Sequence, residues 1–140
     1  MTLAATKRQD NERGPVIYVS SDASYRDGSA GIAYHGDQLG SDARVMECRS
    51  SSEAELRALL LAMTAAERAG LTEVTFKTDD VSAAQPDLGE GEELRPLREQ
   101  VASFLSRHSP GWCTEQIPRS ENLVANALAR EALSGLRRAQ

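Results

Sequence analysis

The sequence predicts an α/β fold, with one mixed five-stranded sheet and helices on both of its faces. Five segments have strand character and three have the helical period, in the order βββαβαβα. Short connections join the first three strands, which is typical of antiparallel hairpins. Helices separate the first, fourth and fifth strands, and such connections favour right-handed parallel crossovers. Helices that bury an apolar stripe must then cover the faces of the sheet.

The strands are expected at residues 16–24, 29–36, 42–49, 73–80 and 112–118. The first begins with the continuous apolar run VIYV, as expected of a central strand that is buried on both faces. Asp27 and Gly28 supply the turn into the second strand. After two serines, the first strand reaches one acidic residue, Asp22, at the rim of the predicted sheet.

Three helices are expected, from Ser52 to Gly70, from about Leu94 to Arg107 and from Ser120 to Gly135. In the first helix, Ser52 is a candidate N-cap, and Glu55 stands three residues later, as a capping box requires. Gly70 supplies the usual stop signal. Before the second helix, Pro86 breaks a weak helical turn, and an acidic loop follows at residues 87–93.

Length and composition predict one domain at residues 14–140, preceded by a polar leader at residues 1–13 that we expect to be disordered. No long apolar run suggests a membrane span, and the amino terminus lacks the core of a secretory signal. Cys48 and Cys113 lack metal-site spacing, so we interpret them as buried free thiols of a cytoplasmic protein. The net charge of −5 means that nucleic acid would need a local basic patch or bound cations.

Two acidic residues end parallel strands of the predicted sheet. Asp22 ends the first strand and Asp79 the fourth. Functional sites in such sheets gather outside the carboxyl ends of the parallel strands. If these strands are neighbours, the two carboxylates lie roughly 5 Å apart and repel each other unless a cation lies between them. Their oxygen atoms suit Mg²⁺ or Mn²⁺.

Helix phase offers Glu55 as a third carboxylate. Leu56, Leu59 and Met63 define the core-facing stripe, Glu55 falls just inside its edge, and Glu53 projects to the far side. An acidic group on an inward face is costly unless it is paired or bound to a metal. The alternative is that Glu55 only completes the capping box, and helix phase does not separate these two interpretations.

The final helix contains two asparagines one turn apart, Asn122 and Asn126. They lie on one flank of the predicted core stripe, and a polar flank is also ordinary for a surface helix. The residues of that stripe are Val124, Ala125, Leu128, Ala132 and Leu136.

Together these segments resemble the type 1 ribonuclease H family, in the form without a basic handle region, over roughly residues 16–135. SDAS is similar to the first-strand motif of the family and SEAELRALLLAM to its helix motif around A-E-L. FKTDD is similar to the T-D-S motif, with Asp80 where serine is usual. WCTEQIPRSENLVANALAREAL resembles the closing motif, which contains N-x-x-A-D-x-L-A. The resemblance implies a ribonuclease H-like fold with strand order 3-2-1-4-5.

In that family, four carboxylates hold two Mg²⁺ ions beside the scissile phosphate of RNA paired with DNA. The resemblance implies that Asp22 bridges two Mg²⁺ or Mn²⁺ ions, and that Glu55 and Asp79 hold the second ion. Asn126 occupies the fourth catalytic and metal-binding position. Glu55 would also lie near the RNA 2′-hydroxyl group, which distinguishes RNA from DNA. The implied substrate-binding residues are Ser24, Asn122 and Arg119.

Two features depart from the family pattern. Asn126 stands where the family has aspartate, and an amide keeps a carbonyl acceptor but loses the negative charge, so we expect weaker binding of the water-activating ion. A deliberate substitution, a natural neutral ligand and a decaying site are all compatible with this asparagine. The turn before the last helix lacks the histidine of some members, and Arg119 is the nearest charged group, either contacting phosphate or lying in solvent.

The leading interpretation is a metal-dependent endonuclease that cuts the RNA strand of RNA/DNA hybrids, acting as a monomer without a membrane partner. The alternative is a non-catalytic ribonuclease H-like module that binds nucleic acid or a protein. A related nuclease with another substrate is a third interpretation, because the fold alone does not determine function.

Overall fold

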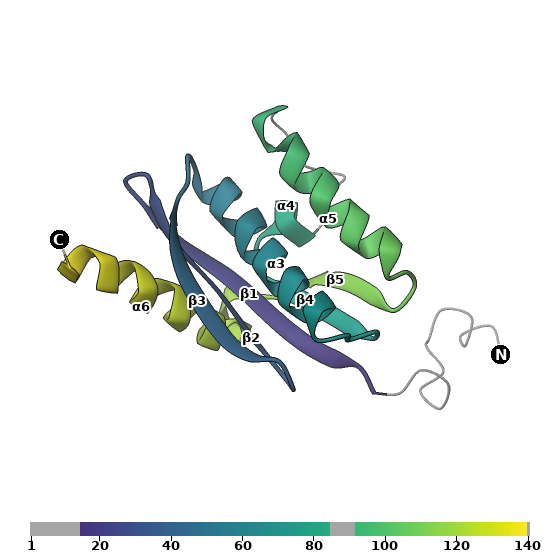
Figure 1. Ribbon diagram of the computed structural model, residues 1–140. Coiled ribbons are helices and arrows are strands. Elements are labelled where there is room, and N and C mark those ends of the chain that lie inside the picture. Colours follow the sequence, from purple (N-terminus) through teal and green to yellow (C-terminus); the bar gives the residue numbers. More distant parts are fainter. Residues whose placement is uncertain (1–14, 85–91, 140) are drawn as a thin grey trace.

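A single five-stranded sheet organises the protein, in the order β3-β2-β1-β4-β5 that the sequence predicts (Figure 1). The computed structural model describes residues 15–84 and 92–139, so the predicted leader and most of the acidic loop lie outside the described residues. The strands are β1 (Ile17–Arg26), β2 (Ser29–Gly36), β3 (Gly40–Glu47), β4 (Val74–Thr78) and β5 (Trp112–Gln116). The helices are α3 (Ser51–Arg68), α4 (Val81–Ala84), α5 (Arg95–Arg107) and α6 (Leu123–Ala139), with 3₁₀ turns η2 (Glu92–Leu94) and η3 (Arg119–Glu121).

The strand pairing is mixed, as expected. β1 pairs antiparallel with β2 and parallel with β4, while β2–β3 is antiparallel and β4–β5 is parallel. The β1–β2 ladder continues to Arg26, but the β1–β4 ladder ends where Ser20 pairs with Lys77. Beyond that pair, Asp22 and Asp79 lie where the two parallel strands no longer form a ladder.

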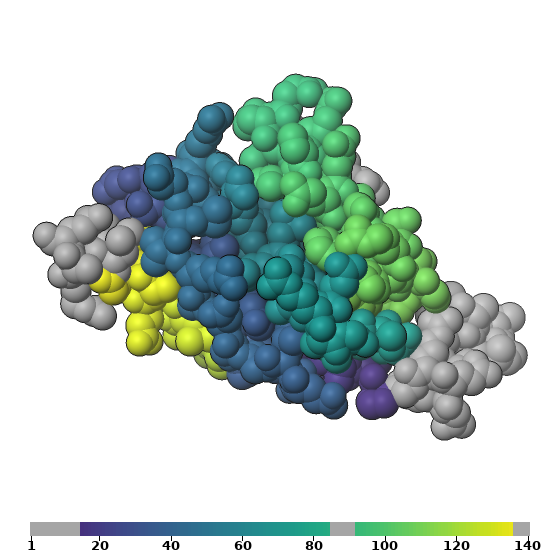
Figure 2. Space-filling view, viewed as in Figure 1, coloured from purple at the N-terminus to yellow at the C-terminus, as the bar shows by residue number. Residues whose placement is uncertain are grey.

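Helices α3 and α6 cover opposite faces of the sheet (Figure 1). Ile32 of β2 packs in one cluster with Ala54 and Ala58 of α3. Its neighbour Gly31 lies against Ala129 of α6. Because successive strand residues point to opposite faces, the two helices lie on opposite sides. In the space-filling view, β3, α3 and α5 form the visible face, and α6 emerges in yellow behind the edge of the sheet (Figure 2).

The main core lies between the sheet, α3 and α5. Phe76 of β4 and Trp112 of β5 meet edge to face, with ring centroids 4.9 Å apart. Leu97 and Val101 of α5 belong to the same buried cluster. This packing holds β4 and β5 beside β1, so the carboxyl ends of the parallel strands share one rim.

The capping of α3 differs from the prediction. Ser50, not Ser52, is the N-cap, and its side chain accepts a hydrogen bond from the amide of Glu53 over 3.1 Å. Glu53 reaches back to the amide of Arg49 over 2.8 Å. The capping box assigned to Ser52 and Glu55 is therefore wrong. Three consecutive serines give equivalent sequence signals, and packing against the sheet selects the register.

The final helix also differs. It begins at Leu123 after the 3₁₀ turn, so the predicted cap at Ser120 is wrong, and it continues beyond Gly135. Val124 is 50% exposed, so its placement in the core is also wrong. Among the residues of this helix whose burial is described, 123–135, the buried ones are Ala125, Ala129 and Leu133, and Asn122 is buried immediately before the helix; the predicted core residue Leu136 lies outside that range. Asn122 thus lies on the packed side of the helix.

Two further sequence expectations bear on the surface. Cys48 is buried, but Cys113 is exposed on β5, so the second half of the buried-thiol interpretation is wrong. Within residues 15–84 and 92–139, no helix is long and apolar enough to cross a membrane.

Gly31 allows α6 to approach β2 closely, and its substitution tests this packing. A Cβ atom at this position would collide with the backbone carbonyl oxygen of Ala129 and lie 3.0 Å from the amide nitrogen of Leu133. We expect Gly31→Ala to lower the free energy of unfolding by about 3 kcal/mol, because backbone cannot move aside as a side chain can. Gly28, which has a φ of +84° and open space around it, is the control: Gly28→Ala should cost about 1 kcal/mol. Urea denaturation measures both, and equal losses would contradict the close approach.

Candidate active site

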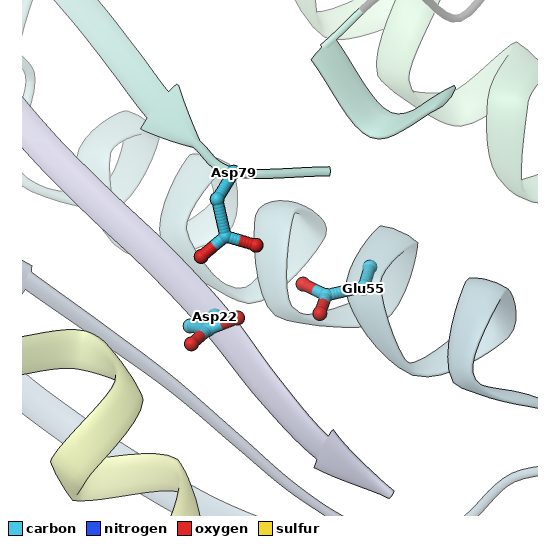
Figure 3. A group of neighbouring side chains, drawn as sticks. All are labelled: Asp22, Glu55 and Asp79. Carbon is cyan, nitrogen blue, oxygen red and sulfur yellow. The ribbon is translucent and has the colours of Figure 1, made fainter. Parts of the chain in front are cut away.

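Three carboxylates from three separate elements converge at the carboxyl end of the parallel strands. Asp22 lies in β1, Glu55 in the second turn of α3, and Asp79 immediately after β4. Each contributes an oxygen atom to a set in which all atoms lie within 4.8 Å of one another. Figure 3 shows the three side chains approaching one common region.

Two adjacent aspartates after β4, Asp79 and Asp80, have different roles. Oδ2 of Asp80 accepts hydrogen bonds from the hydroxyl of Ser82 over 2.7 Å and from the amide of Ala83 over 2.9 Å. Asp80 therefore caps the short helix α4. Asp79, one residue earlier, projects instead toward Asp22 and Glu55 (Figure 3).

The position of Glu55 resolves the choice between capping and clustering. Ser50 and Glu53 satisfy the start of α3, and Glu53 also pairs with Arg57 over 2.8 Å on the outer side of the helix. Glu55 has no part in capping. Among the described residues, its buried Oε1 atom receives no hydrogen bond from an amide, hydroxyl or cationic group, and the Glu55 carboxyl shares a side-chain hydrogen bond with Asp22. A buried carboxylate oxygen without a donor group is costly, and it is the kind of atom that a cation stabilises.

Burial and mutual repulsion dominate the electrostatics of the cluster. Burial raises the pKa of Glu55 to about 10, and the charges of Asp22, Asp79 and Asp80 add to the shift. Burial also raises the pKa of Asp22, which is 2% exposed, although a hydrogen bond from Asn126 opposes the shift. The two shifts indicate that the cluster lacks enough positive charge of its own to stabilise three ionised carboxylates.

Both asparagines of the closing motif contact the cluster. Nδ2 of Asn126 donates to Oδ2 of Asp22 over 2.8 Å. Nδ2 of Asn122 donates to Oδ2 of Asp79 over 3.1 Å and to the backbone carbonyl oxygen of Ser21 over 2.9 Å. A carboxylate only accepts hydrogen bonds, so the amide nitrogens must face the aspartates. Asn122, predicted to bind substrate, is 1% exposed and bonds protein atoms.

A polar cavity of about 480 Å³ opens above the cluster. Ser24 and Arg119, both predicted to bind substrate, line it together with Asn126. Arg130 also lines the cavity, although the sequence did not lead us to predict it. Its position four residues after Asn126 could have indicated this, because residues at that spacing lie on the same face of a helix.

The donor set fits a divalent cation of the Mg²⁺ or Mn²⁺ type. Carboxylate oxygens are the ligands that these hard ions prefer. One oxygen of Glu55 is buried without a donor group, and the cluster itself carries too little positive charge. Asp22, Glu55 and Asp79 would hold the ion, and the carbonyl oxygen of Asn126 would be a neutral fourth donor.

The sheet order, the helix on each face and the acidic cluster at the strand ends define a ribonuclease H-like domain. The family described as "Reverse transcriptase-like" matches residues 34–132, and the chain belongs to this ribonuclease H-like family. The match includes Glu55, Asp79 and Asn126 but begins after Asp22, which the fold brings to the same site. No curated protein matches the sequence significantly.

Solved structures share this fold at low sequence identity. RNase H1 from the halophilic archaeon Halobacterium salinarum has a TM-score of 0.75 and 21% identity, over 86% of this chain and 99% of that chain. LC11-RNase H1 from compost, in complex with an RNA/DNA hybrid, has a TM-score of 0.76 and 20% identity, over 86% and 98%. The amino-terminal RNase H domain of a Mycobacterium tuberculosis protein, fused to maltose-binding protein, has a TM-score of 0.78 and 19% identity, over 89% and 97%.

The raised pKa of Glu55 predicts that Glu55→Gln stabilises the chelator-treated protein. Because the pKa in the folded state, about 10, exceeds the ordinary value of 4.5, the folded state retains a proton that the unfolded state loses. The contribution of Glu55 to stability is therefore most favourable below pH 4.5 and becomes less favourable as the pH rises toward 10. At pH 7 to 8, Glu55→Gln should raise the free energy of unfolding by about 2 kcal/mol.

Glu53→Gln is the matched control, because it makes the same change two residues away. Hydrogen bonding to the amide of Arg49 holds the pKa of Glu53 below its usual range, so its stabilising effect is present above that range and lost as the pH falls. Glu53→Gln should therefore destabilise the protein at neutral pH. Urea denaturation between pH 4 and 9 measures both variants, and a Glu55→Gln variant less stable than the parent at pH 8 would contradict the prediction.

Proposed function

We propose that this protein is a divalent-cation-dependent endonuclease that hydrolyses the RNA strand of RNA/DNA hybrids. The observation that supports the proposal most directly is the convergence of Asp22, Glu55 and Asp79 within 4.8 Å, below an open polar cavity. The family and the fold are consistent with such an activity, and one structure with this fold contains an RNA/DNA hybrid.

The proposed reaction adds water across a phosphodiester bond. The oxygen of water bonds to phosphorus, the bond from phosphorus to the 3′ oxygen breaks, and the products carry a 5′-phosphate and a 3′-hydroxyl group. When bound, two Mg²⁺ or Mn²⁺ ions supply an activated water and a counter-charge for the leaving oxygen. Asp22 would contact both ions, Glu55 and Asp79 the second, and Asn126 the first.

Substrate binding has to overcome the acidity of the chain, whose net charge is −5. Arg119 and Arg130 are exposed residues on the wall of the cavity. We assign both to the phosphates of the substrate, since arginine recognises phosphate through paired hydrogen bonds. Ser24 contributes a hydroxyl group at the same wall. Glu55 faces the cavity and is the proposed contact of the RNA 2′-hydroxyl group.

Asn126 favours one alternative, a non-catalytic module that binds nucleic acid or a protein. Its amide nitrogen bonds Asp22, and the position lacks the fourth negative charge. The remaining three carboxylates argue for the enzyme, because three clustered acids, one buried and two partly buried, destabilise a protein that has no use for a cation. We further propose that the protein is a monomer, that it is cytoplasmic and that residues 14–140 form its single domain.

A cleavage assay with labelled RNA/DNA hybrid, in Mg²⁺ and in Mn²⁺, tests the activity. We expect the hybrid to be cut in its RNA strand. Asp22→Ala should lower the cleavage rate by roughly three orders of magnitude, because Asp22 would hold both of the proposed metal ions. Parallel reactions with double-stranded RNA and double-stranded DNA test the substrate class. Unchanged cleavage in Asp22→Ala would place the chemistry at another site.

Asn126→Asp tests the role of the neutral fourth position. We expect this variant to cleave faster than the parent by about tenfold at limiting Mg²⁺, since it restores a charge at the activating ion. Asn126→Ala is the matched control and should cleave more slowly than the parent. The absence of cleavage by both the parent and Asn126→Asp would favour the binding module.

A further inference from the structure

The beginning of α6 presents two side-chain amides to the cluster, one for each aspartate. Asn126 bonds Oδ2 of Asp22 over 2.8 Å, and Asn122 bonds Oδ2 of Asp79 over 3.1 Å. The two asparagines are four residues apart and therefore project from the same side of the chain. A carboxylate held through one oxygen has a restricted orientation, so α6 determines how both aspartates face Glu55.

Asn122 also connects the two parallel strands beyond the end of their ladder. The ladder between β1 and β4 ends at Ser20 on β1. Just past it, Nδ2 of Asn122 donates both to the backbone carbonyl oxygen of Ser21 and to Asp79. The side-chain amide of Asn122 thus links β1, the strand that carries Asp22, to the side chain of Asp79. The separation of the two aspartates depends on this bridge.

The burial of Asn122 distinguishes a positioning role from simple packing. Asn122 is 1% exposed, and its Oδ1 atom is buried without a hydrogen-bond partner. A buried carbonyl oxygen without a partner is unfavourable, and an apolar side chain would fill the same space without that cost. The other buried positions of this stripe are indeed apolar: Ala125, Ala129 and Leu133. The advantage that offsets the cost is the pair of hydrogen bonds donated at the site.

We propose that Asn122 and Asn126 form an amide clamp that holds Asp79 and Asp22 in the orientation required for divalent-cation binding, Asn122 as a positioning residue alone and Asn126 through its amide nitrogen in addition to its proposed role as a ligand. Asn122 acts through Asp79 and has no contact with substrate. The inference rests on the proposed metal site, but it concerns the residues that set cation affinity, and it does not depend on which nucleic acid is cut.

Cation affinity measured directly is the test. Isothermal titration calorimetry of Mn²⁺ into chelator-treated and dialysed protein gives the Kd of the parent, of Asn122→Leu and of Asn126→Ala. Asn122→Leu retains the volume and removes the donor. We expect each variant to bind Mn²⁺ at least about tenfold more weakly, as is typical when a group that orients a metal ligand is removed. Circular dichroism establishes that each variant is folded, and Asn122→Ala replaces any leucine variant that is not.

Leu133→Ala is the matched control on the same helix. Leu133 is buried, so its truncation should lower the melting temperature of the protein while leaving the Mn²⁺ Kd within twofold of the parent. A second readout is the side-chain amide NMR signal of Asn122, which should shift during Mg²⁺ titration with the Kd of the site. A Kd within twofold of the parent in Asn122→Leu would overturn the clamp, because Asn126→Ala also removes a proposed ligand.

The outcomes separate the clamp from the nuclease proposal. If the parent binds Mn²⁺ but does not cleave any hybrid, the nuclease proposal is wrong, and the clamp is still judged by the Kd values of its variants. If the parent binds no Mn²⁺, both proposals are wrong. If the parent binds Mn²⁺ and cleaves hybrid, while Asn122→Leu binds Mn²⁺ as the parent does, only the clamp is wrong.

Discussion

Repulsion among three clustered carboxylates, of which Asp22 is buried and Glu55 and Asp79 are partly buried, is the constraint on which the rest of this structure depends. Asp22, Glu55 and Asp79 come from three elements that are distant in the chain, and each must lose hydration to reach the common rim. No local preference brings them together. The apolar core between the sheet and α3 provides the free energy that holds the three carboxylates together. Hydrogen bonds from nearby polar groups then reduce the electrostatic cost of the cluster.

Helix α6 supplies most of that local compensation, and the way it packs explains how. Gly31 lets the backbone of α6 lie directly against β2 on the side of the sheet opposite α3. This close approach brings the side chains of Asn122 and Asn126 within hydrogen-bond distance of the two aspartates. The packing of α6 against Gly31 and the hydrogen bonds from the two asparagines therefore depend on each other. If α6 moved away from the sheet, both amide groups would move away from the aspartates.

A neutral residue at position 126 changes the balance between stability and cation binding. An asparagine donates a hydrogen bond to Asp22, whereas an aspartate would add a fourth negative charge beside it. The amide therefore stabilises the cluster before a cation binds and, as the proposed fourth ligand, would hold the cation more weakly than an aspartate. The gain in stability without a cation is a physical reason why a site with three carboxylates can have an asparagine at position 126. It also connects the two proposed roles of α6, which are to orient the aspartates and to set the cation affinity.

The sequence by itself determined the element order and the acidic ends of two parallel strands, because these depend on local periodicity and on how strands connect. The strand order and the choice of Glu55 as the third carboxylate came from the resemblance to the ribonuclease H family. Only the tertiary structure decided which serine caps α3, which side of α6 is buried and that Arg130 reaches the cavity. Adjacent serines and neighbouring helix positions differ little in local preference. Contacts with the sheet separate them, and those contacts join residues that are far apart in the chain.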